Sequence, residues 1–430
     1  MDALEYNKRL VSFESTSNLS NVAVSDYCEE VLTGLGFAIE RIEYDDPYGV
    51  RKASVIGKKG DGTGGMAYFG HTDVVPADPW HTDDFGAFEP TIVGDRLYGR
   101  GSCDMKGSIA CMFAAAERLS DLTLKHPIYI TCTSDEEIGY GGAMAVAERS
   151  EMFREMVAGQ SRGIIGEPTM LEVVYAHKGT TGLVATSHGK ASHSSTRAGL
   201  NANLAMIPYL AEMKRIHDET ESSAEWQNEE FDPPTISWNI GINDHTAAVN
   251  ITPPKSVCTV YFRAMPGQQI DSLIERARAT AEECGIEFVV KSRAEPLHID
   301  PDSPFVREVL DLAGRETPTT VCYGTDGGML TDLENMVVIG PGDIAQAHTW
   351  DEFIALEQLE LGTDLYPSHD RCLVRLAPTG FPDPPPPRCR RSGLSGRFEP
   401  ACLPVEHFGI KHVDFRRFGA TFRHSGSGLW

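Results

Sequence analysis

Apolar and polar residues alternate in recognisable patterns from the start of the chain. Residues 22–35 place apolar side chains at helical spacing and end in Gly-Leu-Gly, which predicts a helix. Residues 37–44 alternate between apolar and polar side chains, as a strand does. Residues 57–65 are rich in glycine and predict a turn, and the short apolar run 66–69 after it predicts a buried strand.

Several strand-like runs end in residues that can bind metal ions or transfer protons. An alanine-rich helix is predicted at 107–119, between the first two of these runs. Alternating strands and helices predict an α/β protein with a mainly parallel sheet, in which ligands bind at the carboxyl ends of the strands. The runs are 66–69, 127–133, 163–165 and 336–339, and the polar residues that follow them are His71, Asp73, Glu136, Glu137, Glu167 and His348.

The middle of the chain has a different pattern. Residues 178–187 and 256–263 are strand-like, whereas 201–216 and 270–284 have helical periodicity. This pattern predicts a small α+β domain inserted into the larger α/β domain. The predicted division is 1–180 and 294–366 for the two parts of the larger domain, 181–293 for the inserted domain and 367–430 for a tail.

Composition and charge narrow the class of protein. The chain has 430 residues, 41% of them hydrophobic and 23% charged, as expected for a folded protein of two domains. Its net charge of −24 argues against partners such as nucleic acid or anionic membrane lipid. The first 21 residues lack a secretory signal, no apolar run is long enough to span a membrane, and the ten cysteines are irregularly spaced. We therefore expect a cytoplasmic protein with reduced thiols.

The tail differs from the rest of the chain. Residues 367–430 contain ten basic and five acidic side chains and nine of the 26 prolines. One hypothesis is a shifted reading frame or gene-model error that replaces the true C-terminus, and the other is a genuine disordered extension. On either hypothesis we expect poor order there and no part in catalysis.

Two histidines among several carboxylates suit zinc or a similar divalent ion. Taken singly, each residue has an ordinary structural interpretation, because a His-x-Asp turn or a Glu-Glu pair is common on protein surfaces. Their shared position after strand-like runs favours a metal site. The sequence motifs of serine hydrolases, of HExxH metalloproteases and of phosphate-binding loops are absent from the sequence.

Six segments, in order and spacing, resemble the M20 family of metallopeptidases and deacylases. The resemblance covers about residues 4–366. It implies an α/β catalytic domain that holds two zinc ions and an inserted ferredoxin-like domain that serves as dimerisation surface and lid. The segments are GHTDVVP (70–76), LYGRGSCDMKG (97–107), TSDEEIG (133–139), GEPT (166–169), HKGTTG (177–182) and GPGDIAQAHTWDEF (340–353).

The resemblance also implies the roles of the metal ligands. Cobalt or manganese could occupy the same ligands as zinc. In the family pattern His71 and Glu167 bind one ion, Glu137 and His348 bind the other, and Asp104 bridges the two.

Two further residues of the catalytic domain receive roles from the resemblance. Glu136 is the general base that takes a proton from a water bridging the two ions and delivers it to the leaving amine. Asp73 accepts the free N–H of His71 and so fixes its tautomer. The peptide bond between Asp104 and Met105 is expected to be cis, as is typical of the family.

The inserted domain supplies candidates for contacts with the substrate. His193 in GKASHSS matches a family histidine that reaches across a dimer interface to the tetrahedral oxyanion. Asn250 and Arg263 match positions that hold the α-carboxylate of the substrate, and Thr325 lies in a segment that resembles a substrate-lining loop. Alternatives left open are a loop histidine for His193, a turn cap for Asn250 and an interface salt bridge for Arg263.

The resemblance therefore implies an enzyme that cleaves the amide bond of an N-acyl amino acid. Glu167 and the segments around it favour the acetylornithine deacetylase and succinyl-diaminopimelate desuccinylase branch of the family. Other M20 activities, namely aminoacylase, dipeptidase or carboxypeptidase, remain alternatives, as does a catalytically silent metal-binding relative. The expected assembly is a homodimer formed through residues 181–293.

Overall fold

The computed structural model describes residues 1–120, 123–244, 246 and 248–373. In this part of the chain nine strands form one central sheet, in the order β1-β2-β6-β3-β7-β15-β8-β13, with β14 beside β8. The strands are β1 (Ala38–Asp45), β2 (Arg51–Lys59), β3 (Met66–His71), β6 (Ile128–Thr133), β7 (Arg162–Ile165), β8 (Val174–His177), β13 (Leu297–His298), β14 (Thr319–Val321) and β15 (Met336–Val338).

The centre of this sheet is parallel and its flanks are antiparallel. β6, β3, β7 and β15 run in the same direction, whereas β1 and β2 on one side pair antiparallel with their neighbours. On the other side β8 pairs antiparallel with β15 and β13 and parallel with β14. His71, the last residue of β3, is paired with Thr133, the last residue of β6. The predicted α/β class is confirmed, and the parallel strands bring the candidate residues to one edge of the sheet.

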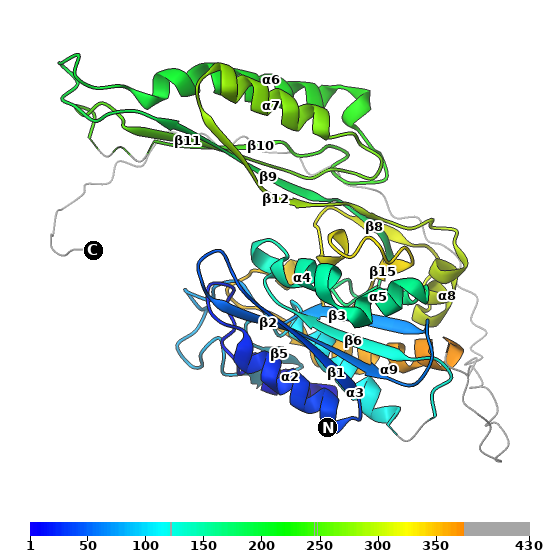
Figure 1. Cartoon of the computed structure of the whole chain (residues 1–430). Coiled ribbons are helices and arrows are strands. Elements are labelled where there is room, and N and C mark those ends of the chain that lie inside the picture. The colour runs from blue at the N-terminus through cyan, green and yellow to red at the C-terminus, as the bar shows by residue number, and fades with distance from the viewer. Residues whose placement is uncertain (121–122, 245, 247, 374–430) are drawn as a thin grey trace, which may run out of the picture. The chain divides into compact units, whose positions relative to one another are not determined.

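Helices cover both faces of the central sheet, so its strands are buried on both sides. In β3, Met66 and Tyr68 point into one hydrophobic core, and Ala67 and Phe69 point into the other. Figure 1 shows α2, α3 and α9 on the first face and α4 and α5 on the second. The helices that flank the sheet are α1 (Ala3–Val11), α2 (Val22–Gly34), α3 (Lys106–Arg118), α4 (Gly141–Arg149), α5 (Glu151–Ala158), α8 (Pro304–Ala313) and α9 (Leu356–Leu373).

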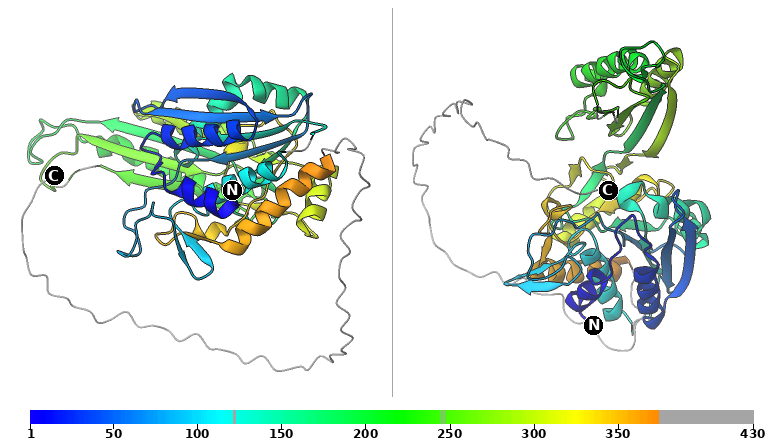
Figure 2. Two further views of the ribbon diagram at one scale, coloured as in Figure 1. Left: turned by 90° about the horizontal axis from the view of Figure 1, so that it is seen from below. Right: turned by 90° about the vertical axis from the view of Figure 1, so that its left-hand side faces the viewer.

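A second sheet occupies the region predicted as α+β. Its strands, in the order β10-β11-β9-β12, are all antiparallel, and the chain order β-α-β-β-α-β is the ferredoxin-like arrangement. Helices α6 and α7 lie side by side on one face of this sheet (Figure 2). The elements are β9 (Thr180–His188), α6 (Ala202–Ser222), β10 (Asn239–Asn243), β11 (Lys255–Phe262), α7 (Asp271–Glu283) and β12 (Glu287–Ala294). The division of the chain into domains at residues 181 and 293 stays a prediction.

A third, small antiparallel sheet consists of β4 (Thr91–Val93), β5 (Arg96–Tyr98) and β16 (Phe353–Ala355). Helix α9 follows β16 and continues to Leu373, so it includes the first seven residues of the predicted tail. The rest of the predicted tail lies outside the described residues. None of the helices in the described part of the chain is both long and apolar enough to cross a lipid bilayer.

Gly340, which follows β15, packs against the backbone after β7. A Cβ atom at this position would lie 2.3 Å from the carbonyl oxygen of Gly166 and 2.5 Å from that of Glu167. Gly340→Ala should therefore lower the free energy of unfolding by roughly 1–3 kcal/mol, as overpacking does, measured by urea denaturation. Gly34→Ala is the matched control, because its Cβ would meet nothing within 4 Å. Equal stability of the two variants would contradict this close packing.

Candidate active site

Three strands of the central sheet deliver side chains to the same place. His71 ends β3, and Glu167 follows the end of β7, its parallel neighbour. Glu136 and Glu137 lie in the short 3₁₀ helix η1 (Glu136–Ile138), just after β6. Because β6, β3 and β7 are parallel neighbours, their carboxyl ends meet, as the sequence predicted for these four residues.

Two loops supply the remaining candidate ligands. Asp104 lies just before α3, and the peptide bond between Asp104 and Met105 is cis, which confirms that expectation. His348 follows β15 and the 3₁₀ helix η4 (Ile344–Gln346) and has a φ of 62°, in the left-handed region. Both side chains reach the edge of the sheet from outside it.

The carboxylate of Asp104 lies between the two histidines. Its Oδ1 is 3.3 Å from Nε2 of His71, and its Oδ2 is 3.6 Å from Nε2 of His348. One oxygen thus faces each imidazole, which is the arrangement that a carboxylate bridging two metal ions requires.

Each histidine also has a second carboxylate beside it. Oε1 of Glu167 is 3.9 Å from Nε2 of His71, and Oε2 of Glu137 is 2.9 Å from Nε2 of His348. The potential ligand atoms of His71, Asp104 and Glu137 all lie within 4.8 Å of one another. The structure therefore brings together the five residues predicted as ligands, in two groups that share Asp104.

The cluster has more negative charge than its imidazoles balance. Burial raises the pKa values of Glu136, Glu137 and Glu167, and repulsion between neighbouring carboxylates adds to the rise. Burial alone would lower the pKa of His71, but its hydrogen bond to Asp104 and the charges of Glu167 and Glu136 raise it well above the usual value. A divalent cation would relieve this repulsion, and imidazole and carboxylate are suitable ligands for one.

Asp73 orients His71 through its main-chain oxygen. Nδ1 of His71 is 2.9 Å from the main-chain oxygen of Asp73 but 3.7 Å from its carboxylate. Asp73 thus accepts this N–H, as predicted, and it does so with its main-chain oxygen. The carboxylate instead accepts the main-chain N–H groups of Glu136 and Glu137, at 3.1 and 3.3 Å. Because Nδ1 donates to the main-chain oxygen, Nε2 is the nitrogen that faces Asp104 and that would bind a metal ion after losing its proton.

The hydroxyl of Thr325 is engaged by protein groups. It donates to Nε2 of His177 at 2.9 Å and accepts the N–H of Gly327 at 3.1 Å. This donor assignment follows because Nδ1 of His177 donates to the main-chain oxygen of Lys178. Thr325 is buried, and the next residue, Asp326, is a buried carboxylate whose pKa burial raises to about 6. Sequence reasoning had treated this segment only as a substrate-lining loop.

The three candidates in the inserted region do not meet within one chain. His193 is exposed and pairs with Ile251, and the N–H of Ser194 donates to the main-chain oxygen of Asn250 at 2.9 Å. Arg263 follows the far end of β11, where its guanidinium lies 5.4 Å from the ring centroid of Tyr261. Because eight residues of strand extend for about 23 Å, His193 and Asn250 lie together but far from Arg263.

Sequence reasoning missed a buried ion pair beside the cluster. Nη1 of Arg100 is 2.8 Å from Oε2 of Glu352, and both side chains are almost completely buried. Both residues lie in segments that resemble the M20 family, but nothing in the sequence around them indicates that these charged side chains are buried. A second buried pair, Lys52 and Asp135, was missed for the same reason.

The site combines two imidazoles with several carboxylates at the carboxyl ends of parallel strands, and one glutamate, Glu136, is not among the predicted ligands. This combination is characteristic of a metal-dependent hydrolase. The chain belongs to the peptidase family M20/M25/M40, whose family model matches residues 67–368. Membership of this family makes it a hydrolase that acts on amide bonds.

Relatives with known names cover most of the chain. An acetylornithine deacetylase from Myxococcus xanthus is 34% identical over 365 residues, which cover 81% of this chain and 92% of the relative. An acetylornithine deacetylase from Vibrio cholerae is 31% identical over 375 residues, which cover 83% of this chain and 94% of the relative.

Solved structures show the same fold. An M20 family metallo-carboxypeptidase from Sulfolobus solfataricus matches with a TM-score of 0.66 and 18% identity, covering 86% of this chain and 99% of its own. Human carnosine dipeptidase 1 matches with a TM-score of 0.65 and 17% identity, covering 86% and 96% of the two chains.

A divalent ion should stabilise the folded protein by relieving repulsion in the cluster. Zinc added to metal-free protein at a hundred times its dissociation constant should raise the free energy of unfolding by about 2.7 kcal/mol, seen as a higher melting temperature. His71→Ala should lose most of this increase. His188→Ala is the control, because His188 lies in an exposed ion pair with Glu287. A zinc response in His71→Ala equal to that of the control would contradict the metal site.

Proposed function

We propose that this protein hydrolyses the amide bond of N-acyl amino acids, as its acetylornithine deacetylase relatives are named to do, in the cytoplasm and with two bound zinc ions. Cobalt or manganese would suit the same ligands. The observation that carries this proposal is the position of Asp104, with one carboxylate oxygen toward each histidine. The names of the curated relatives support the choice of substrate class.

The five clustered residues would hold the two ions in the proposed site. When bound, the ions would lower the pKa of a water molecule and polarise the carbonyl group of the substrate. His71 and Glu167 would bind one ion, Glu137 and His348 the other, and Asp104 both. Nε2 of His71 is available for this role because Nδ1 donates its proton to the main-chain oxygen of Asp73.

Glu136 is the proposed general base. It adjoins Glu137 in η1, and its main-chain N–H is held by the carboxylate of Asp73. Its side chain takes a proton from the attacking water and later gives it to the leaving nitrogen, so that the base is regenerated in each cycle. Asp73 thus positions both His71 and Glu136.

Residues around the second sheet are proposed to recognise the substrate. Arg263 presents a planar guanidinium that can bind the α-carboxylate of an amino acid through two hydrogen bonds. Asn250 would add a contact to this carboxylate, and His193 would donate to the oxyanion. The segment of Thr325 would line the same site. Because Asn250 and His193 lie far from Arg263 within one chain, we assign them to the active site of a partner chain.

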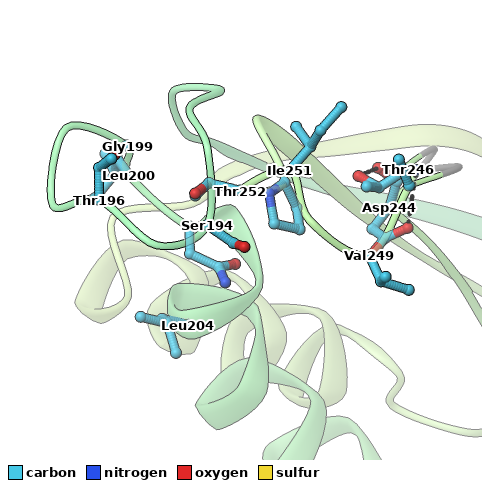
Figure 3. Close-up of a pocket in the computed structure, with 13 residues that line it drawn as sticks. Ser194, Thr196, Gly199, Leu200, Leu204, Asp244, Thr246, Val249, Ile251 and Thr252 are labelled. Atoms are coloured by element: carbon cyan, nitrogen blue, oxygen red, sulfur yellow. Dashed lines mark hydrogen bonds between the residues drawn. The ribbon is translucent and has the colours of Figure 1, made fainter.

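The proposed dimer surface lies on the ferredoxin-like region. Leu204, Ile207, Ile242 and Val249 expose between 59% and 103% of their surface. In the described sheet β10 is an edge strand, which leaves main-chain groups available for pairing with a second chain. A hollow of about 610 Å³ lies beside this surface. Figure 3 shows three of the residues that line it, Leu204 on α6 and Val249 and Ile251 on the loop before β11. Contiguous exposed apolar residues of this kind favour association.

A substrate panel tests the proposed activity. Metal-reconstituted protein should cleave acetylornithine faster than succinyl-diaminopimelate, other N-acyl amino acids or dipeptides, measured as kcat/KM for each. A preference for one of the others would reassign the enzyme to the corresponding M20 activity. Absence of any turnover in protein with both ions bound would indicate a catalytically silent relative.

Replacement of Glu136 separates the base from the metal ligands. Glu136→Gln should lower kcat by roughly a hundredfold to ten-thousandfold while the zinc content stays at the wild-type value, because only the proton acceptor is lost. Glu137→Gln, one residue away, should instead reduce the zinc content. Undiminished turnover in Glu136→Gln would exclude Glu136 as the base.

Mixing two inactive variants tests whether His193 acts across the dimer. His193→Ala and Glu136→Gln are each expected to be inactive, but a mixed dimer contains one site with both residues intact. Refolding equal amounts together should therefore restore about a quarter of the wild-type activity, since half of the dimers are mixed and have one intact site. Mixing His193→Ala with itself is the control. Full specific activity in a demonstrated monomer would refute the cross-chain role.

A further inference from the structure

Arg100 and Glu352 form a buried ion pair that none of the proposed chemical steps uses. The exposed fractions of the two residues are 1% and 0%, and Nη1 of Arg100 lies 2.8 Å from Oε2 of Glu352. Moving two charges from water into a protein interior costs several kcal/mol for each ion, and the attraction between them seldom exceeds that cost. Stability alone therefore gives little reason to bury this pair.

Glu352 organises the loop that carries Asp104. Its Oε2 accepts the main-chain N–H of Gly101 at 2.8 Å, and its Oε1 accepts those of Cys103 and Asp104, each at 2.9 Å. Three main-chain donors of the loop thus converge on one carboxylate, together with the guanidinium. The bridging carboxylate of Asp104 is attached to a main chain that Glu352 fixes.

Arg100 joins this loop to two others. Its Nη2 donates to the main-chain oxygen of Thr349, next to His348, at 2.7 Å. The same nitrogen is 3.3 Å from the main-chain oxygen of Pro76, in the segment that follows His71. Arg100 belongs to the segment that carries Asp104, and its guanidinium contacts the segments that carry His71 and His348.

We propose that Arg100 and Glu352 are positioning residues that set the place of Asp104 relative to His348, and thereby the affinity for the ion on the His348 side. This inference rests on the proposed two-metal centre. Metal ligands must match their ideal distances within about 0.2 Å, which loops do not achieve unless other groups hold them. His348 needs such support because its side chain is 57% exposed, whereas the side chain of His71 is 1% exposed on a buried strand.

Arg100→Lys tests the positioning role while preserving the charge pair. A lysine ammonium can pair with Glu352, but it lacks the planar fork that reaches Glu352, Thr349 and Pro76 together. Metal-free protein should be titrated with cobalt, and the two ions followed by their visible absorption. The first ion should bind as in the wild type, and the second about 10–100-fold more weakly, as when the partners of metal ligands are removed.

Glu352→Gln is a second, independent variant, and combining it with Arg100→Gln gives a neutral pair. The neutral pair removes the cost of an unpaired buried charge, so its urea midpoint should approach that of the wild type, whereas its second cobalt ion should stay weakly bound. Glu308→Gln is the matched control, because Glu308 pairs with Arg162 at the opposite end of β7 from Glu167. This control should bind both ions with wild-type affinity.

The outcomes separate this inference from the proposed function. Wild-type binding of both ions in folded Arg100→Lys or in the folded neutral-pair variant would overturn the positioning role and leave the metal centre intact. A wild-type protein that binds fewer than two cobalt ions would instead contradict the proposed two-metal centre. Weaker binding of the second ion in the Glu308→Gln control as well would also overturn the inference, because the effect would then follow from any altered ion pair.

Discussion

Repulsion between carboxylates at one edge of the central sheet is the constraint on which the rest of the structure depends. Two unit charges 4 Å apart interact with about 4 kcal/mol at an effective dielectric constant of 20, so a group of this kind repels itself strongly. The folded chain holds Asp104, Glu136, Glu137 and Glu167 close to two histidines all the same. A rigid scaffold holds these groups together, and the proposed cations would offset their repulsion.

The scaffold is not equally rigid on the two sides of Asp104. His71 and Glu167 are attached to the ends of strands that are buried on both faces, so packing fixes their main chain. On the other side, His348 is on a loop and Glu137 is in a single 3₁₀ turn. Hydrogen bonds replace packing there. The carboxylate of Asp73 accepts a main-chain N–H of η1, and Arg100 donates to a main-chain oxygen in the loop of His348. Polar networks thus fix the main chain on this side of Asp104, as packing within the sheet does on the other side.

The sequence predicted the features that depend on local pattern. The helix at 22–35 and the strand at 37–44 agree with α2 and β1, and the runs that end in ligands correspond to β3, β6, β7 and β15. Residues 57–65 were predicted as a turn, but 57–59 belong to β2, where a Cβ on Gly57 would meet Phe37 at 3.2 Å. In a sequence, a glycine required for close packing cannot be distinguished from a glycine required for a turn. The Arg100–Glu352 pair was missed because burial of a charge depends on partners distant in sequence.

The positions of Arg263, Asn250 and His193 limit how a substrate can be recognised. β11 separates Arg263 from the other two, so a small amino acid held by Arg263 beside one metal cluster is beyond the reach of His193 in the same chain. In the proposed dimer, a two-fold axis through the ferredoxin-like regions makes each chain both donor and recipient of these contacts. The exposed apolar residues on α6 and beside β11 would then serve catalysis as well as assembly, because in the proposed dimer the surface that joins the chains would also complete each active site.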